Sequence, residues 1–255
     1  MSTDTRAGTA VYVYGVVPAD VEVDAETRGV GDPPAPVTTI RSGPVAAIVS
    51  EIPVDAPLGR PEDLSAHASL LDAVAAELPV LPLRFGAVVT DEQAVAEELL
   101  EANRDDFTTA LDQLEGKAEY IVRGRYEERA ILREVLSGDD RMAELAKAIR
   151  GKPEDATRSE RMELGEQISR TIEAKRAEDT QRVAEALAEI AVQAAPREPT
   201  HEEEAVHLAV LAETARQAEL EEAVGELANE WEGRVQVRLL GPLAAYDFVV
   251  TRTPE

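Results

Sequence analysis

The run from Ala156 to Ala194 constrains the fold most, because it contains no proline and a single glycine, Gly165. Proline and glycine are disfavoured in helix interiors more than any other residues. The run therefore predicts one helix of about 39 residues, which would be roughly 58 Å long at about 1.5 Å per residue. Its middle, Glu173 to Arg182, is almost wholly polar. Because a helix that is polar all round is solvated, we expect a projecting helix or a helical hairpin.

The residues before this run predict a mixed α/β unit. Ala10 to Val17 reads AVYVYGVV, a β-branched and aromatic run that is typical of a strand. Pro61, followed by acidic residues, is typical of a helix start. The patterns together predict a strand over 10–17, a hairpin of 37–41 with 45–52, a helix over 61–78, an interrupted strand over 80–89, and a helical region capped by Asp91 that runs to Leu114 with a break near Asn103.

The residues after Gly116 predict a second set of strands and helices. These are a strand over 117–126, short helices over 127–136 and 141–149, strands over 205–211 and 234–240 with a helix over 215–231 between them, and a last strand over 246–251. A strand, a helix and a strand of these lengths predict a right-handed parallel crossover. With the strand over 117–126 and another near 196–200, the pattern favours a ferredoxin-like arrangement with an insertion.

The predicted fold class is α+β with two domains. We expect an N-terminal mixed α/β domain over 1–116 and a C-terminal modified ferredoxin-like domain over 117–255, with the long inserted helix or helical hairpin at about 156–194. A chain of 255 residues is long enough for each domain to bury a core of its own.

The charge balance excludes one class of partner. Lys and Arg total 26 against 51 Asp and Glu, which gives a formal net charge of -25 at pH 7. Nucleic-acid binding depends on clustered Lys and Arg that displace counterions, so we expect no nucleic-acid partner. No uncharged stretch approaches the ~20 residues of a membrane helix, and the first residues lack an apolar signal-peptide run. We therefore expect a cytoplasmic protein with no membrane span.

The sequence predicts neither catalysis nor metal binding. There is no cysteine, and the histidines are His67, His201 and His207. A zinc-binding helix pairs histidines four residues apart, a spacing that no two of these have. We interpret the run HEEEAVH over 201–207 as a solvated run of charges. Since no phosphate-binding glycine loop and no GxSxG motif occurs either, we expect no enzyme and no cofactor.

Arg84 is the least expected residue, because it lies inside the apolar run 80–89. A charged side chain there is unfavourable unless it is paired or reaches solvent. Our first interpretation is structural: an arginine that ties the two domains together through a carboxylate. On that interpretation, Arg84→Ala would destabilise the fold before it abolished binding. The second interpretation is a direct contact with a partner.

Four segments carry a family likeness: VYVYGVV at 11–17, LPVLPLRFGAVV at 78–89, EYIVRGRYEE at 119–128 and RLLGPLAAYDFV at 238–249. Together with the long helix and its polar centre, they resemble the landmarks of gas vesicle F/L proteins (GvpF/GvpL) in the same order. The PLRFG segment and the terminal Gly-Pro segment are the most specific parts. One departure is that Leu243, Ala244 and Ala245 stand where the family pattern usually has Trp-Pro-Pro. An aromatic contact at that place would be weakened here.

The resemblance implies a non-enzymatic accessory protein of gas vesicle assembly, located at the gas vesicle in the cytoplasm. The implied partners are GvpA, the small hydrophobic shell protein, and other gas vesicle accessory proteins. Within the matched segments, we expect Arg84, Phe85, Arg123 and Tyr246 to contact a partner. The alternative is a ligand-binding or regulatory protein with a ferredoxin-like domain, because that fold hosts many functions.

Overall fold

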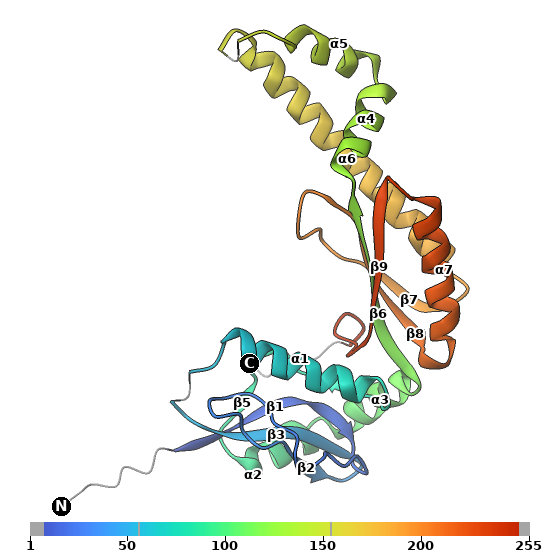
Figure 1. Ribbon diagram of the computed structural model, residues 1–255. Helices are drawn as coiled ribbons and strands as arrows, with labels where there is room; N and C mark the ends of the chain where they lie inside the picture. The colour runs from blue at the N-terminus through green and yellow to red at the C-terminus, as the bar shows by residue number, and fades with distance from the viewer. Residues whose placement is uncertain (1–7, 56, 154, 250–255) are drawn as a thin grey trace, which may run out of the picture. The chain divides into compact units, whose positions relative to one another are not determined.

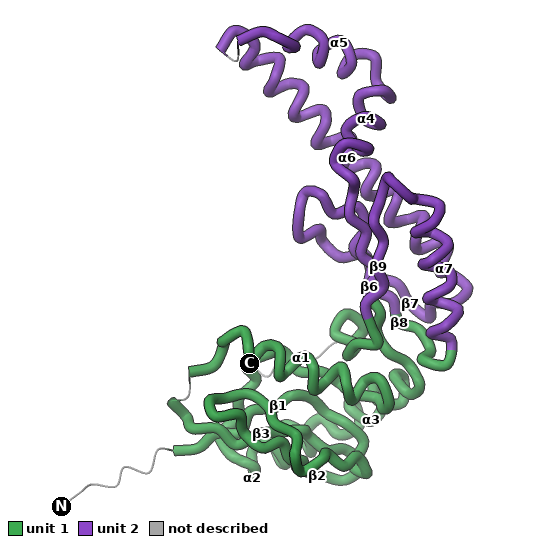
Figure 2. The backbone as a smooth tube through the Cα atoms, in the orientation of Figure 1, with its two compact units in different colours: residues 1–120, 211–215, 241–255 green, residues 121–210, 216–240 purple. Residues whose placement is uncertain are grey.

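The computed structural model describes residues 8–55, 57–153 and 155–249 (Figure 1). Contacts between residues divide the chain into two compact units (Figure 2). The first comprises residues 1–120, 211–215 and 241–255, and the second comprises 121–210 and 216–240. The domain boundary at residue 116 stays a prediction. The contact units differ from it in that the end of the chain returns to the first unit.

The sheet of the first unit is built on a long antiparallel pair. Strands β1 (Thr9–Pro18) and β3 (Val45–Pro53) pair along their whole length, with one irregularity between Val13 and Gly15. The strand order is β2-β3-β1-β4, and β5 also pairs with β1; the remaining bounds are β2 Thr38–Ser42, β4 Leu81–Pro82 and β5 Val88–Val89. The predicted first strand, hairpin and interrupted strand are therefore confirmed.

Both faces of this sheet are covered. The alternation along β1 points Val11, Val13 and Val16 into one apolar cluster, and Tyr12, Tyr14 and Val17 into another. The first cluster contains residues of the π-helix η1 (Val95–Glu101) and α3 (Arg104–Leu114), and the second contains residues of α1 (Pro61–Ala75). Figure 1 shows α1 on one side of the sheet and α2 (Glu92–Ala94) on the other.

The start and the break of the second helical region are confirmed. The Asp91 side chain accepts a hydrogen bond from the Ala94 N–H at 2.8 Å, which caps α2. Asn103 interrupts the helical path before α3, as its φ of -118° shows.

The second unit has a four-stranded sheet in the order β7-β8-β6-β9. The bounds are β6 Lys117–Tyr126, β7 Ala191–Pro196, β8 Glu204–Glu213 and β9 Val235–Leu243. Between β8 and β9 lie the short helix η3 (Thr214–Arg216) and α7 (Gln217–Glu230), which buries Leu220, Val224 and Leu227 as predicted.

A helical insertion follows β6. It consists of α4 (Glu128–Gly138), α5 (Asp140–Ile149), the short η2 (Asp155–Thr157) and α6 (Arg158–Ala186). Helices α4 and α5 both contact α6, which follows them in the chain (Figure 1). A helix or helical hairpin was predicted at about 156–194, whereas that range holds the single helix α6 and the strand β7, and α6 packs with the preceding α4 and α5. Among the described residues, no helix is both long enough and apolar enough to cross a membrane.

The long helix is shorter than predicted. It ends at Ala186 after 29 residues, and the chain then turns into β7. Leu187, at the C-cap, is fully buried, and Ala191–Pro196 pairs with β8 instead of continuing the helix. The sequence pattern missed this because alanine and valine at an edge strand also fit a helix. The strand expected near 196–200 consequently lies earlier in the chain.

The predicted last strand is wrong for residues 246–249, where the chain turns at 246–248, while 250–251 lie outside the described residues. Strand β9 also continues through Gly241 and Pro242 to Leu243, beyond the predicted end at residue 240. The backbone after β9 is satisfied by side chains: the Asp247 N–H donates to Glu119 Oε2 at 2.9 Å.

Candidate functional site

An arch over residues 83–87 separates β4 from β5, and both of these two-residue strands pair with β1. Its ends are fixed by hydrogen bonds from Leu83 N to Tyr14 O and from Val13 N to Ala87 O, both 2.9 Å long. Gly86 has a φ of +92°, a conformation that favours glycine. The PLRFG segment therefore needs its glycine to turn the chain back towards β1.

His67 of α1 lies beneath this arch and is 3% exposed. Its Nε2 is 3.1 Å from the Leu83 carbonyl oxygen and 2.9 Å from the Tyr246 hydroxyl, and its Nδ1 is 2.9 Å from the Tyr12 hydroxyl. Because a carbonyl oxygen can only accept, we infer that Nε2 carries the proton and that Tyr12 donates to Nδ1. The Tyr12 hydroxyl in turn accepts from Gly86 N at 3.2 Å.

Burial sets the protonation of this cluster. It lowers the pKa of His67, and a weaker hydrogen-bond contribution from the Leu83 backbone opposes that effect. Burial likewise raises the pKa of Tyr12 to about 12. At neutral pH the site is thus a neutral imidazole held by neutral hydroxyls and a peptide oxygen.

Aromatic rings surround the imidazole. Tyr14 stacks on His67 at 5.7 Å between ring centroids, and Phe85 meets it edge-on at 5.6 Å. Two of the residues predicted to contact a partner, Phe85 and Tyr246, are therefore brought together by His67. Tyr246 is 40% exposed and Phe85 is partly exposed, so both reach the surface beside the arch.

The sequence reasoning missed His67 as the centre of this site. Leu64 and Leu78 lie in the range predicted as a helix, 61–78, but they are 49% and 42% exposed, and α1 ends at Ala75. The buried face is instead Asp63, His67, Leu71 and Ala75, a repeat of four residues. Asp63 can be buried because it accepts hydrogen bonds from Gly31 N at 2.9 Å and Arg60 N at 3.1 Å. One signal in the sequence could have shown this. His67 lies four residues before Leu71, so both face the same side of the helix.

Arg84 is exposed at the top of the arch. Within the described part of the first unit, its side chain makes no hydrogen bond and no ion pair. Within the first unit its charge reaches solvent, which removes the cost of burying it. The interpretation of Arg84 as a tie between the two domains stays a prediction, as does a direct contact with a partner.

The chain end is held against the same unit by side chains. The Ala244 N–H donates to Asp72 Oδ1 at 3.0 Å, and the Asp247 N–H donates to Glu119. Ala244 and Ala245 are 0% and 3% exposed and belong to the two apolar clusters. In this chain, the places of the usual Trp-Pro-Pro are thus partly buried positions filled by small side chains, and Tyr246 is the aromatic residue left at the surface.

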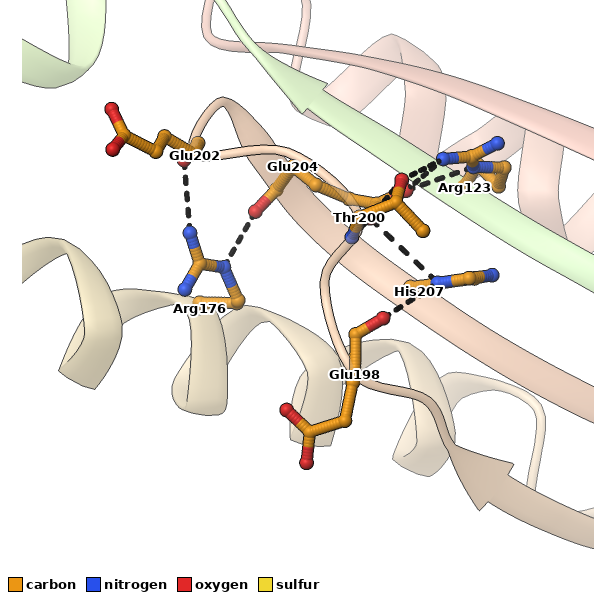
Figure 3. A network of polar contacts seen from close by, with 7 residues as sticks. All are labelled: Arg123, Arg176, Glu198, Thr200, Glu202, Glu204 and His207. Carbon is orange, nitrogen blue, oxygen red and sulfur yellow. Dashed lines mark hydrogen bonds and ion pairs between the residues drawn. The ribbon is translucent and has the colours of Figure 1, made fainter.

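Arg123 lies apart from the arch, in a polar network of the second unit (Figure 3). Its Nε donates to Glu204 Oε1 at 2.8 Å, and its NH2 donates to Thr200 Oγ1 at 2.8 Å. Arg176 donates to the backbone oxygens of Glu204 and Glu202, at 2.6 and 2.9 Å. The Arg123 side chain thus makes its hydrogen bonds within the second unit, whereas Phe85 and Tyr246 belong to the first.

The run 201–207 is only partly the solvated run that was predicted. Glu204 and His207 are 4% and 7% exposed. Burial would raise the pKa of Glu204, but hydrogen bonds from Thr200 N and from Arg123 lower it below its usual range. His207 Nδ1 is 3.1 Å from the Glu198 carbonyl oxygen. Among the residues that the structure describes, no cluster of His, Asp or Glu could hold a metal ion.

Comparison with known proteins agrees with the likeness seen in the sequence. The family model described as "Gas vesicle synthesis protein GvpL/GvpF" matches residues 10–250. The chain belongs to the GvpL/GvpF family. Gas vesicle protein F of Streptomyces sp. (strain CB03234) is 30% identical over 243 residues, which cover 94% of this chain and 99% of that protein. Gas vesicle protein L of the same organism is 33% identical over 136 residues, 48% of each chain.

Solved structures of family members share the fold. The crystal structure of GvpF from Anabaena sp. PCC7120 superposes with a TM-score of 0.78 at 19% identity and covers 96% of this chain and all of that one. GvpF from Microcystis aeruginosa gives a TM-score of 0.75, also at 19% identity, over 94% of this chain and 98% of that one. At this identity the likeness concerns the fold alone: a mixed α+β chain with two sheets.

Proposed function

We propose that the chain is a non-enzymatic accessory protein of gas vesicle assembly that binds GvpA, the small hydrophobic shell protein, and other gas vesicle accessory proteins. Family membership supports the link to gas vesicles. The observation that carries the binding proposal is the arch, where Phe85 and Tyr246 both contact buried His67 and reach the surface, and where Arg84 is exposed. Aromatic and arginine side chains are enriched among the residues that dominate binding.

The surroundings of the arch suit an apolar partner. Val88 of β5 directly follows the arch and is 46% exposed. The net charge of -25 supplies the complementary property, because a strongly acidic protein resists association with itself. We propose that an acidic body with one apolar surface keeps an aggregation-prone β-rich shell subunit dispersed until it is incorporated. On this proposal, the protein acts at the gas vesicle in the cytoplasm.

We infer in addition that the second unit is a modified ferredoxin-like domain. Its elements follow the chain order β6, helical insertion, β7, β8, α7, β9, and its strands follow the order β7-β8-β6-β9. This order supports the assignment because β6 lies between the two strands that α7 connects. The insertion then replaces the first helix of the simple fold with the α4–α6 hairpin.

The binding proposal is tested by co-purification of the full-length chain with GvpA after the two are co-expressed. Val88→Asp introduces a charge beside the arch and is expected to reduce recovered GvpA about tenfold or more, since an unpaired charge in an apolar contact is strongly unfavourable. The matched control is Val54→Asp, because Val54 is 61% exposed on the same unit. Circular dichroism checks that both variants fold.

Equal recovery of GvpA with both valine variants would reject the arch as the binding surface. Absence of GvpA from the wild-type sample at micromolar concentration would reject the binding proposal itself. Deletion of the gene gives the cellular test, and intact, buoyant vesicles in the deletion strain would contradict a role in assembly.

A further inference from the structure

The second unit has an open groove of about 1190 Å³ beside β9. It is lined from four directions: β6 and β9 of the sheet, α6, and the loop before β8. The residues that line it include Arg123, Arg125, Arg176, Arg238, Gln236 and Leu240. In a chain with only 26 basic residues against 51 acidic ones, this is an unusual concentration of arginine.

Most of these arginines are already engaged. Arg123 pairs with Glu204, and Arg125 pairs with Glu203. The Arg176 guanidinium donates to the backbone oxygens of Glu204 and Glu202. Arg238 differs: it is exposed, and among the described residues its guanidinium makes neither a hydrogen bond nor an ion pair. The groove therefore has one uncompensated cation on its β9 side.

The α6 and loop sides of the groove carry negative charge. Glu173 of α6 and Glu202 of the loop line it and are both exposed. A carboxylate entering the groove is therefore attracted to the β9 side and repelled from the α6 and loop sides. The charge pattern fixes where an anionic side chain can lie: against Arg238.

Strand β9 is also the free edge of its sheet. It stands at the end of the order β7-β8-β6-β9, so β6 is its sole partner strand among the described residues. Apart from that ladder, described residues make no backbone hydrogen bond to residues 236–240. An exposed edge offers a row of N–H and C=O groups to an incoming strand.

The side chains of β9 match this edge to the groove. Gln236, Arg238 and Leu240 alternate along the strand and line the groove together, as the period of two requires. Leu240 is 44% exposed. A strand added beside β9 would meet, on the groove side, a cation and then an apolar side chain two residues later.

We infer that the edge of β9 over residues 236–240 binds an extended segment of a partner protein in which acidic and apolar residues alternate. Main-chain hydrogen bonds to β9 supply affinity, a carboxylate against Arg238 fixes the register, and an apolar residue packs on Leu240. The surface shares no residue with the arch. The inference thus goes beyond the proposed function and does not depend on it.

The test uses the full-length chain and an end-capped nine-residue peptide of alternating valine and glutamate, labelled for fluorescence anisotropy. We expect saturable binding, together with slower amide hydrogen exchange at residues 236–240. A peptide with glutamine in place of glutamate is expected to bind about tenfold more weakly, because it lacks the charge-assisted hydrogen bond to Arg238. A peptide methylated at every backbone amide is expected not to bind, because it cannot donate to β9.

Two protein variants form a matched pair. Arg238→Gln is expected to weaken binding of the valine–glutamate peptide about tenfold. Arg125→Gln, which removes an arginine already paired with Glu203 in the same groove, is expected to leave it within about twofold. No binding at millimolar peptide, equal binding of the methylated peptide, or equal effects of the two variants would each overturn the inference. Loss of GvpA binding in the co-purification experiment would leave all these results unchanged.

Discussion

The two units bury polar groups in different ways. In the first unit, the buried cluster around His67 is joined by hydroxyls, an imidazole and peptide groups, and one ion pair with a buried carboxylate is Arg60–Asp63. In the second unit, buried Glu204 and Asp179 are both held by arginines. Neutral hydrogen bonds depend little on salt, whereas ion pairs depend on the charge of both partners. The units should therefore respond differently to substitution and to acid.

Asp179→Ala in the second unit is expected to have the largest effect. Asp179 accepts the Tyr126 hydroxyl at 2.7 Å and two Arg234 donors at 3.0 and 2.9 Å, and it joins the helical insertion to the sheet. Its loss leaves Arg234 and Tyr126 short of a partner in a mostly buried place. We expect the free energy of unfolding to fall by about 3 kcal/mol, the lower end for a broken buried pair, because Arg234 keeps Glu134.

Chemical unfolding followed by circular dichroism measures this loss. Arg182→Ala is the control, because it breaks an ion pair between α6 and Glu230 in which both side chains are about half exposed. It is expected to change stability by less than about 1 kcal/mol. Similar losses in the two variants would mean that burial does not distinguish the ion pairs of the second unit.

His67→Leu is the corresponding change in the first unit, with a smaller expected effect. It leaves the Tyr12 and Tyr246 hydroxyls and the Leu83 carbonyl without the imidazole, while the apolar volume is roughly kept. We expect a loss of about 1–3 kcal/mol and faster amide exchange at Gly86, whose N–H is held by Tyr12. Ser65→Ala on the exposed side of the same helix should change neither quantity, and unchanged exchange in His67→Leu would contradict a role for His67 in holding the arch.

Acid should separate the units by the pH at which each loses stability. Burial lowers the pKa of His67, so the folded first unit binds fewer protons than the unfolded chain. Its stability therefore falls as the pH drops below the unfolded histidine pKa, about 6.5. In the second unit, Glu134 and Glu204 have lowered pKa values because arginine and backbone donors outweigh burial. Their contribution is complete above the unfolded glutamate pKa, about 4.3, and is lost as the pH falls further.

Residue-resolved amide exchange measured from pH 7 to pH 4 checks this order. The amides of the arch should lose protection first, between about pH 6.5 and pH 5, while those of β8 and α6 keep theirs until about pH 4. In His67→Leu, the early loss should vanish. Protection lost at the same pH in both units would mean that carboxylates such as Asp63, whose pKa is lowered by Gly31 N–H, control the first unit as well.

The same contrast explains what the sequence could predict. Strands such as β1 and β8, and helix starts such as Pro61 and Asp91, follow from local patterns of apolar, proline and capping residues. The end of α6 could not be predicted locally, because Ala191–Pro196 leaves the helix only through pairing with β8. The turn over 246–248 likewise depends on Glu119, a residue far away in the sequence.

The candidate site was predictable only in part, for the same reason. Phe85 and Tyr246 could be named from the segments that carry the family likeness, but nothing in either segment shows that His67 joins them. Hydrogen bonds of the imidazole to residues 12, 83 and 246 arise from tertiary packing alone. Arg123 and Arg84 were both expected to contact a partner. The structure separates them, because Arg123 has Glu204 and Thr200 as partners and Arg84 is exposed.

Arg84→Ala should have the smallest effect on stability and so gives the sharpest test of that separation. The Arg84 side chain lacks a hydrogen bond within the described first unit, so we expect the free energy of unfolding to change by less than about 0.5 kcal/mol. Arg123→Ala, in contrast, removes the arginine partner of the buried Glu204 carboxylate. It should lower the free energy of unfolding by about 2 kcal/mol. If Arg84→Ala retains its fold and recovers less GvpA, the arginine contacts the partner. A loss of stability as large as that of Arg123→Ala would support the structural interpretation of Arg84.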